Sequence, residues 1–466
     1  MRRAVILITF LAVSGFAQQD VGKVAFANSG AAAAQEPFLR GLAQLHNFEY
    51  DSAATLFRRA QELDPSFAMA FWGEAMTHTH PIWFQQDLAA ARAVLQRAPK
   101  AKTERERDYL RTLDVLYGDG TKNERDVKYS EAMLALHAKY PGDVDATAFT
   151  ALSILGTAHE GRDFATYMRA AALLEEVFPS NRRHPGVLHY LIHSYDDPVH
   201  APLGMRAARL YGAVAPNAGH ALHMTSHIFV AMGMWDDVID ANRRAIEVVK
   251  RERPAVCGHY PIWLHYGYLQ KHRNDEARGM LDACRAFAFA ADTSRQRLAD
   301  YADMVANHVA AGLPLGEADR LTPPDGVSAP NAAFTMAYAG MLAAAQGGDA
   351  AAMQAAVSNL RNAYKARETE KTPGRRMRAD VMMQEGEVLL LVANGKRAEA
   401  IALLEKIAEN EHEMPLEFGP PEIPKPAAEL LAEQLTAAGR PEEAAAAYRR
   451  SLERAPGRTQ SAMHIH

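Results

Sequence analysis

The sequence predicts an all-α protein made of antiparallel helical hairpins that stack into an α-solenoid. Its composition favours helices, because 48% of its 466 residues are hydrophobic, Ala, Leu and Met are abundant, and long β-branched runs are absent. Three successive hairpins are expected to end at Pro179, at Pro216 and near Lys250, so that their ends are 37 and 34 residues apart. A chain of this length is long for one compact core, whereas the core of a solenoid grows as repeats are added.

The clearest repeats lie near the two ends of the chain. Residues 37–65 and 431–456 each carry small, aromatic, small and proline residues in the order used by the tetratricopeptide repeat (TPR), which is about 34 residues long. Small residues let two helices approach, the aromatic ring fills the gap to the next hairpin, and proline ends the second helix. We therefore predict a tetratricopeptide-like α-solenoid. The positions are Gly41, Ala53, Phe57, Ala60 and Pro65 in the first repeat and Gly439, Ala444, Tyr448 and Pro456 in the last.

The repeats are expected to form two groups. Residues 313–330 are rich in Pro, Gly and Asp, which favour turns, so we expect a loop there. It would separate N-terminal TPR-like repeats at 37–312, which contain most of the histidines, from C-terminal TPR-like repeats at 331–456. Residues 18–36 are expected to form a flexible lead-in and residues 457–466 a disordered tail.

The N-terminus is typical of an export signal. Residues 1–17 begin with Arg2 and Arg3, continue with an apolar stretch and end with small residues, which predicts a signal peptide cleaved after Ala17. A membrane anchor is the alternative, but the apolar run is shorter than the roughly 20 residues that a membrane-spanning helix needs. We expect an exported protein, periplasmic or secreted, with no membrane span after cleavage.

Several classes of function are not supported by the sequence. The formal net charge of −5 includes no basic block, so nucleic acid is not an expected partner. The chain contains no CxxCH, HExxH or GxSxG motif, so we expect no haem c and find no support for zinc-protease or serine-hydrolase chemistry. No nucleotide cofactor is expected either. Cys257 and Cys284 could form one disulfide in an oxidising compartment, but their spacing leaves this open.

Histidines are concentrated between residues 184 and 227. This stretch holds seven of the nineteen histidines, five of them on two predicted first helices at 185–197 and 219–231. The first helices of TPR hairpins line the concave groove. Spacings of three and four residues place side chains on one face of a helix, and neighbouring helix axes lie about 10 Å apart, so three or four imidazoles could converge on one ion. The candidate ligands are His189 and His193 on the first helix and His220, His223 and His227 on the second.

Two carboxylates follow the first histidine pair. Asp196 and Asp197 lie three and four residues after His193, where either could bind a metal or orient an imidazole. Imidazole ligands with a nearby carboxylate suit Cu, Zn or Fe and disfavour Mg or Ca. The spacing therefore predicts a transition-metal site. Two alternatives remain open: the groove binds an organic ligand, or its histidines only form structural hydrogen bonds.

Other polar and aromatic residues are candidates for the lining of the same groove. They lie at the ends of predicted first helices or in an aromatic-rich stretch, and each has packing as its alternative role. These groove or ligand candidates are His46, His78, His80, Trp83, His159, Trp235, Trp263 and His265.

Four sequence blocks resemble a group of exported, poorly characterised bacterial TPR proteins. They are LHNFEYDSA (45–53), FWGEAM (71–76), HPGVLHYLIHSYDDPVHA (184–201) and HALHMTSHIFVAMGMWDD (220–237). The resemblance covers about residues 37–290; Thr225 departs from the HMPSHI form of the last block and leaves the histidine spacing intact. It implies the fold and no established activity.

Two functions follow from these observations. The first is an exported TPR binding or scaffold protein whose concave groove holds a transition metal and accepts a peptide or protein. The alternative is a metal-dependent enzyme, an oxidase or a hydrolase, in which an open position on the ion activates water or O₂. Ring nitrogens that converge within about 4–5 Å beside an open face would favour the enzyme, and rings spread along the groove would favour an extended partner. Whether the protein is an enzyme is left open by the sequence.

Overall fold

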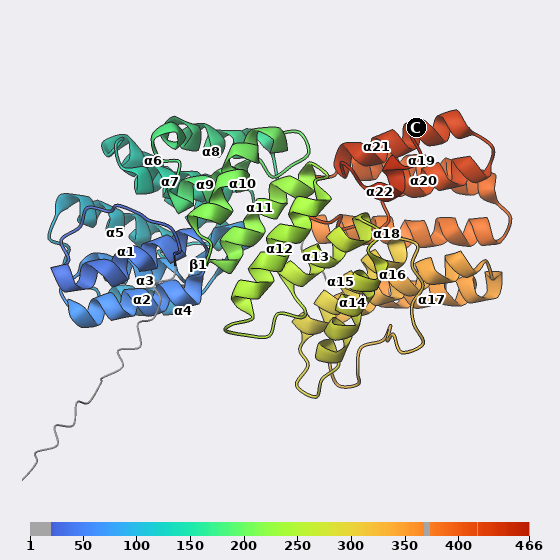
Figure 1. Cartoon of the computed structure of the whole chain (residues 1–466), viewed down its shortest axis with the longest axis horizontal. Helices are drawn as coiled ribbons and strands as arrows, with labels where there is room; N and C mark the ends of the chain where they lie inside the picture. Colours follow the sequence, from blue (N-terminus) through green and yellow to red (C-terminus); the bar gives the residue numbers. More distant parts are fainter. Residues whose placement is uncertain (1–19, 368–372, 417, 466) are drawn as a thin grey trace, which may run out of the picture.

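The computed structural model describes residues 20–367, 373–416 and 418–465. Within these ranges the chain is an all-α, TPR-like solenoid, as the sequence predicts, and the sheet structure is one short antiparallel ribbon of β1 (Thr79–His80) and β2 (Gln85–Gln86). Helices follow one another as antiparallel hairpins from the N-terminal to the C-terminal part of the chain (Figure 1). The expected signal peptide lies outside the described residues.

The N-terminal and central hairpins bring the first helices to one side of the array. The N-terminal helices are α1 (Ala32–His46), α2 (Tyr50–Leu63), α3 (Ala68–Met76), α4 (Leu88–Gln96), α5 (Glu104–Leu116), α6 (Lys122–Lys139), α7 (Val144–Leu155) and α8 (Phe164–Val177). The central helices are α9 (Pro185–Ser194), α10 (Ala201–Val214), α11 (Gly219–Ala231), α12 (Trp235–Val249), α13 (His259–Gln270), α14 (Asn274–Ala288) and α15 (Arg295–Ala310). Two short 3₁₀ helices, η1 (Pro81–Trp83) and η2 (Phe178–Ser180), follow β1 and α8.

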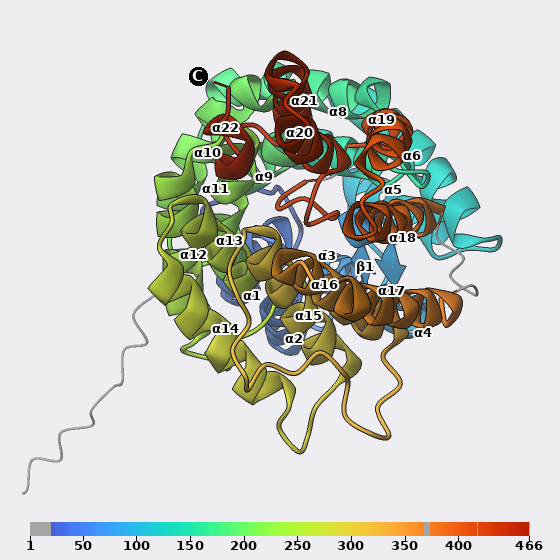
Figure 2. The same cartoon turned by 90° about the vertical axis from the view of Figure 1, so that its right-hand side faces the viewer.

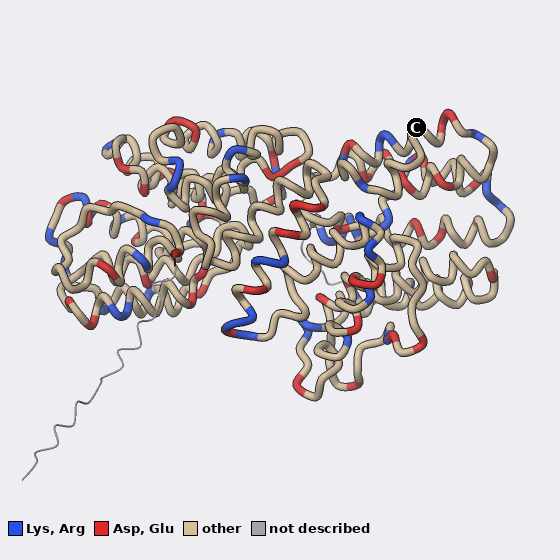
Figure 3. Tube along the Cα trace, in the orientation of Figure 1, with Lys and Arg blue, Asp and Glu red and all other residues tan. Residues whose placement is uncertain are grey.

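The C-terminal hairpins continue the winding. They comprise α16 (Pro330–Gly347), α17 (Ala350–Lys365), α18 (Pro373–Ala393), α19 (Arg397–Glu413), α20 (Ala427–Ala437), α21 (Pro441–Arg454) and α22 (Thr459–Ala462). In the view turned by 90°, the helices form a ring, and the segment between α19 and α20 runs inside it (Figure 2). Acidic and basic residues are interspersed along the chain, as the sequence suggests (Figure 3).

Local sequence explains the hairpins. Thr103 and Thr121 each form a capping box, in which the threonine side chain and a glutamate three residues later satisfy backbone N–H groups at a helix start. The repeat residue Phe57 is fully buried between helices at the two small positions Gly41 and Gly73. A Cβ atom at Gly73 would lie 2.4 Å from the Phe57 ring, so this close helix approach requires glycine.

The hydrophobic core divides earlier than the sequence suggests. One cluster of buried side chains extends from Phe26 to Tyr266 and a second from Leu281 to Tyr448, and a small third cluster, from Ile239 to Ala277, joins α12, α13 and α14 at the division between them. The predicted loop at 313–330 is present between α15 and α16, yet these two helices pack against each other within the second core. The loop packs on the second core through Leu321 and Val327, and its buried Asp319 side chain pairs with Arg278 of α14, so it does not interrupt the array.

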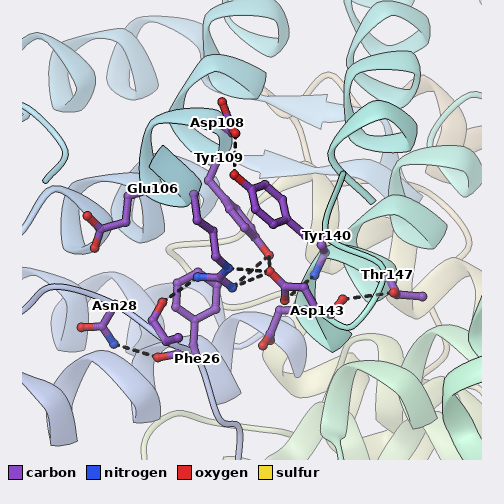
Figure 4. Close-up of polar contacts among 12 residues, drawn as sticks. Phe26, Asn28, Glu106, Asp108, Tyr109, Tyr140, Asp143 and Thr147 are labelled. Atoms are coloured by element: carbon purple, nitrogen blue, oxygen red, sulfur yellow. Dashed lines mark hydrogen bonds and ion pairs between the residues drawn. The ribbon is translucent and has the colours of Figure 1, made fainter. Parts of the chain in front are cut away.

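The N-terminal lead-in is packed rather than free. Val21 and Phe26 are buried, and the Arg105 guanidinium lies 4.0 Å above the Phe26 ring. Arg105 also pairs with Asp143, which accepts a 2.9 Å hydrogen bond from the Tyr109 hydroxyl (Figure 4). These contacts differ from the flexible lead-in expected for residues 18–36, because composition alone does not reveal that an aromatic side chain there finds a partner.

The C-terminal segment also packs against the solenoid. Arg458 is 2% exposed and donates hydrogen bonds of 2.7 and 3.0 Å to Glu429. The Trp235 indole donates to the Gly457 carbonyl at 2.8 Å, and Gln270 binds the backbone N–H of Thr459. These residues lie in the segment 457–466, where the sequence suggests a disordered tail; the buried ion pair and the contacts with α12 and α13 hold it in place.

Two further expectations concern the cysteine pair and membrane-spanning helices. Cys257 and Cys284 form a disulfide with a Cα–Cα distance of 4.8 Å, which answers the question that their spacing left open. Within the described ranges, every helix is too short or too polar to cross a membrane.

Candidate metal centre

Six histidines converge from three successive first helices. α9 carries His189 and His193, α11 carries His220, His223 and His227, and α13 begins with His259. They form two groups, in each of which the ligand atoms lie within 4.8 Å of one another. We refer to His189, His193 and His220 as the first trio and to His223, His227 and His259 as the second trio.

The first trio presents three buried nitrogens without a hydrogen-bond partner among the described residues: Nε2 of His189, of His193 and of His220. The His189 Nδ1 lies 2.6 Å from the His46 carbonyl oxygen. A carbonyl oxygen only accepts, so Nδ1 carries the proton and Nε2 of His189 keeps a lone pair. A buried lone pair with no donor is costly, and a bound cation would satisfy all three.

The second trio contains two imidazoles whose outer nitrogens are held as donors. Nδ1 of His227 donates to the buried carboxylate of Asp196, and Nδ1 of His223 donates to the Asn242 side-chain oxygen at 2.7 Å. The Asn242 amide nitrogen donates to the Val238 carbonyl at 2.9 Å, which orients its oxygen towards His223. Both rings therefore carry their proton on Nδ1.

The inner nitrogens of the same two rings then face each other. Nε2 of His223 and Nε2 of His227 are 3.0 Å apart. Two lone pairs at this distance repel unless a proton or a metal ion lies between them. Burial, followed by the neighbouring histidines, lowers the pKa of His223 well below 6.5, which disfavours a proton. A carboxylate or amide that fixes the outer nitrogen of a histidine is the arrangement that supports metal ligands.

The other buried rings share this preference for the neutral form. Burial is the main cause that lowers the pKa of His189, His193 and His220 well below 6.5, and adjacent histidines lower it further. Neutral imidazole is the form that binds metals. The rings are therefore ready to act as ligands at neutral pH.

Aromatic side chains enclose both trios. The Trp263 ring centre lies 4.3 Å from that of His227 and 4.8 Å from that of His223, and Phe418, in the segment inside the ring of helices, lies 5.2 Å from His227. Phe48 lies 4.3 Å from His189. These walls exclude water from most of the cluster.

One edge of the cluster is open. His259 is exposed and borders two pockets, of about 470 and 360 Å³. The first pocket is also lined by His80, Trp83 and His220, which places these sequence-predicted groove residues beside the first trio. The second is lined by Trp263, by Phe418 and by several arginines.

A third group of ionisable residues has a different hydrogen-bond pattern. His46 and His184 both point Nε2 at Asp145, at 2.9 and 3.3 Å. The His46 Nδ1 faces the Tyr190 hydroxyl at 3.0 Å, and the His184 Nδ1 accepts the Val187 N–H. Every ring nitrogen has a partner, so this group is a structural network, even though its atoms are as close as those of the two trios.

Several predicted residues lie elsewhere. Asp197 accepts hydrogen bonds from Arg162 and His200 and contacts neither trio by hydrogen bond, whereas its neighbour Asp196 supports His227. The remaining four groove candidates are not brought to the trios: Trp235 donates to the C-terminal segment, His159 pairs with Asp126, His265 stacks on His308, and His78 lies outside both pockets beside His259.

Sequence reasoning missed two residues of the cluster. The first is His259, which begins α13, so the histidine pattern extends one hairpin further than the candidate list. Extending the repeat register by one hairpin could have found it. Asn242 is on α12, a second helix, and only the fold shows that it reaches His223.

Comparisons with known proteins identify no family for this chain. No protein-family model and no curated protein matches the chain. Similar solved structures include a chain of the APC/C Cut9–Hcn1 hetero-tetramer (TM-score 0.37, 12% identity, 94% of this chain and 77% of that chain) and human IFIT1 in a dimer with m7Gppp-AAAA (0.33, 12%, 92% and 91%). Another is the TPR domain of P58(IPK) (0.24, 13%, 93% and 96%). TM-scores this low carry no argument about function.

Proposed function

We propose that this chain is an exported TPR-like protein that binds a transition metal in the histidine cluster of its groove. One observation carries the proposal. The Nε2 atoms of His223 and His227 face each other at 3.0 Å while Asp196 and Asn242 hold both Nδ1 atoms as donors. A metal ion satisfies both lone pairs, and the structural alternative leaves them opposed.

The donor set restricts the ion. Both trios offer imidazole nitrogen only, which suits Cu, Zn or Fe and disfavours the hard ions Mg and Ca. Asp196 supports the site indirectly: its carboxylate accepts a hydrogen bond from His227 and belongs to neither trio. The residues that would hold an ion are therefore the two trios, and a bound ion would supply Lewis acidity or redox chemistry there.

The groove beside the cluster is a candidate binding surface. The pocket of about 470 Å³ contains the aromatic side chains of Phe48, Tyr50 and Trp83, and Trp83 is 37% exposed. Aromatic rings with exposed faces contribute strongly to peptide recognition. We propose that a peptide or protein segment occupies this pocket next to the metal.

A metal-dependent enzyme is the second candidate, and the open edge favours it. His259 is exposed, and a trio of histidines leaves a coordination position for water, O₂ or a substrate. The aromatic walls would keep the remaining cluster dry, which strengthens electrostatic effects at such an ion. An oxidase or a hydrolase would use this edge as its entrance.

Metal analysis of the mature chain tests the proposal. Residues 18–466, produced without a histidine tag, should retain tightly bound metal after extensive dialysis. A variant with His189, His193, His223 and His227 changed to Ala should retain none. A variant with His159 and His200 changed to Ala, whose rings lie outside the trios and pair with Asp126 and Asp197, should bind metal like the unmodified chain. Absence of metal after reconstitution with Cu, Zn and Fe would refute the proposal.

A further inference from the structure

Resting on the metal site proposed above, we propose that the cluster holds two metal ions, one in each trio, as a dinuclear centre. Distances between ligand atoms separate the six histidines into two groups, whereas the ring centres of His227 and His259, within the second trio, are 6.3 Å apart. Within the first trio, the ring centres of His189 and His193 are 4.8 Å apart and those of His189 and His220 are 5.1 Å apart. Within the second trio, the ring centre of His223 lies 4.9 Å from that of His227 and 4.5 Å from that of His259.

The two groups lie next to each other. The ring centres of His193 and His227 are 5.8 Å apart, and those of His220 and His223 are 5.9 Å apart. The first contact joins α9 to α11, and the second joins successive turns of α11, so the two trios touch each other at two places. Ions held in the two trios would therefore be neighbours.

A single ion does not satisfy the cluster. An ion between His223 and His227 binds nitrogens at about 2.0–2.1 Å. It leaves the three buried Nε2 atoms of the first trio without a partner among the described residues. Conversely, an ion in the first trio leaves the opposed lone pairs of His223 and His227, which are 3.0 Å apart, in place. Two ions, one in each trio, satisfy both groups.

The charges around the cluster are compatible with a pair of ions. The neutral imidazoles contribute no countercharge, and Asp196 contributes one negative charge through its hydrogen bond to His227. A second atom of the same carboxylate, Oδ1, is buried without a hydrogen-bond partner in the described part of the chain. A bound ion would acidify water at the open edge by His259, and this would supply further negative charge.

Copper stoichiometry tests the inference in the full mature chain. Untagged protein, stripped with a chelator and loaded with copper(II), should retain two copper ions per chain. Its electron paramagnetic resonance signal should account for less than the total copper, because neighbouring ions couple magnetically.

Single variants assign the ions to the trios. His259→Ala changes an exposed ring of the second trio, so the fold should be retained, and His220→Ala changes the first trio. Each variant should hold one copper with a fully detectable, uncoupled signal. Circular dichroism and thermal unfolding would show that the variants are folded.

The outcomes separate this inference from the proposed function. One copper in the unmodified chain, absent from the fourfold alanine variant, would overturn the dinuclear centre and leave the metal site standing. No copper would overturn both. Two coppers that persist unchanged in His259→Ala and His220→Ala, or that are lost together in either variant, would overturn the assignment of one ion to each trio.

Discussion

Replacing Asp196 with Asn should weaken metal binding without removing any metal ligand. Asp196 is 1% exposed, and its carboxylate accepts the Nδ1 proton of His227. Asn can still accept this hydrogen bond through its side-chain oxygen, so the ring orientation is retained. The substitution removes the negative charge that makes Nε2 of His227 a stronger donor to an ion.

The magnitude follows from the role of such supporting groups. Loss of a carboxylate that supports a metal-binding histidine lowers metal affinity by about 10- to 100-fold. Since each factor of ten corresponds to about 1.4 kcal/mol, the expected loss of binding free energy is about 1.4–2.7 kcal/mol. The effect should be confined to affinity, because all six imidazoles remain.

The measurement is a competition titration with a chelator of known affinity, performed with zinc on the chelator-stripped mature chain. Asp197→Asn is the matched control. Asp197 is adjacent in sequence and equally buried, but it pairs with Arg162 and His200 instead of the trios. Its substitution should lower the thermal unfolding midpoint and leave zinc affinity within about twofold. Equal zinc affinities for Asp196→Asn and the unmodified chain would refute the reasoning.

Three further predictions concern the scaffold. Burial lowers the pKa of His46 to about 4, so the unfolded chain gains this proton at higher pH than the folded chain as pH falls from 7 to 4. Urea unfolding should show that the free energy of unfolding falls by about 3 kcal/mol over this range, a loss that His46→Asn lacks, and parallel profiles would contradict this. Arg458→Met should cost about 1.5–3 kcal/mol, because buried Glu429 loses its guanidinium partner and, within the described ranges, retains only Lys425 and the Ser461 hydroxyl. Arg458→Met combined with Glu429→Leu should recover stability in the same assay, and no recovery would argue against the ion pair. Gly419→Ala would place a Cβ atom 2.4 Å from the Trp263 indole ring, which forms part of the metal-site wall. It should lower the thermal unfolding midpoint more than Gly348→Ala, because Gly348 also has a positive φ but has open space around it. Equal shifts would contradict the clash.

The three histidine groups show why proximity is a poor criterion for a metal site. His46 and His184 lie as close to Asp145 as metal ligands would, yet each ring nitrogen has a hydrogen-bond partner. The trios have similar spacing, but their inner nitrogens face one another or have no partner. The position of the proton on each ring, inferred from its outer partner, therefore separates structural histidines from candidate ligands.

Local sequence patterns predict much of the architecture. Helix-forming composition and small, aromatic and proline positions such as Gly41 and Phe57 predict the solenoid, because each hairpin packs mainly against its neighbours. The spacing of His189 with His193 and of His220 with His227 predicts one-sided histidine faces, since helical periodicity alone sets which residues share a face.

Contacts between distant segments depend on the three-dimensional arrangement of the chain. Asp196 and Asp197 both lie just beyond the end of α9, and their side chains point to different partners, so that Asp196 supports His227 and Asp197 pairs with Arg162. His259 joins the second trio because α13 stacks on α11, and Phe418 reaches His227 from a segment about 190 residues away in the chain. Helical periodicity acts within a few residues, whereas these contacts require the superhelix to bring separate hairpins together.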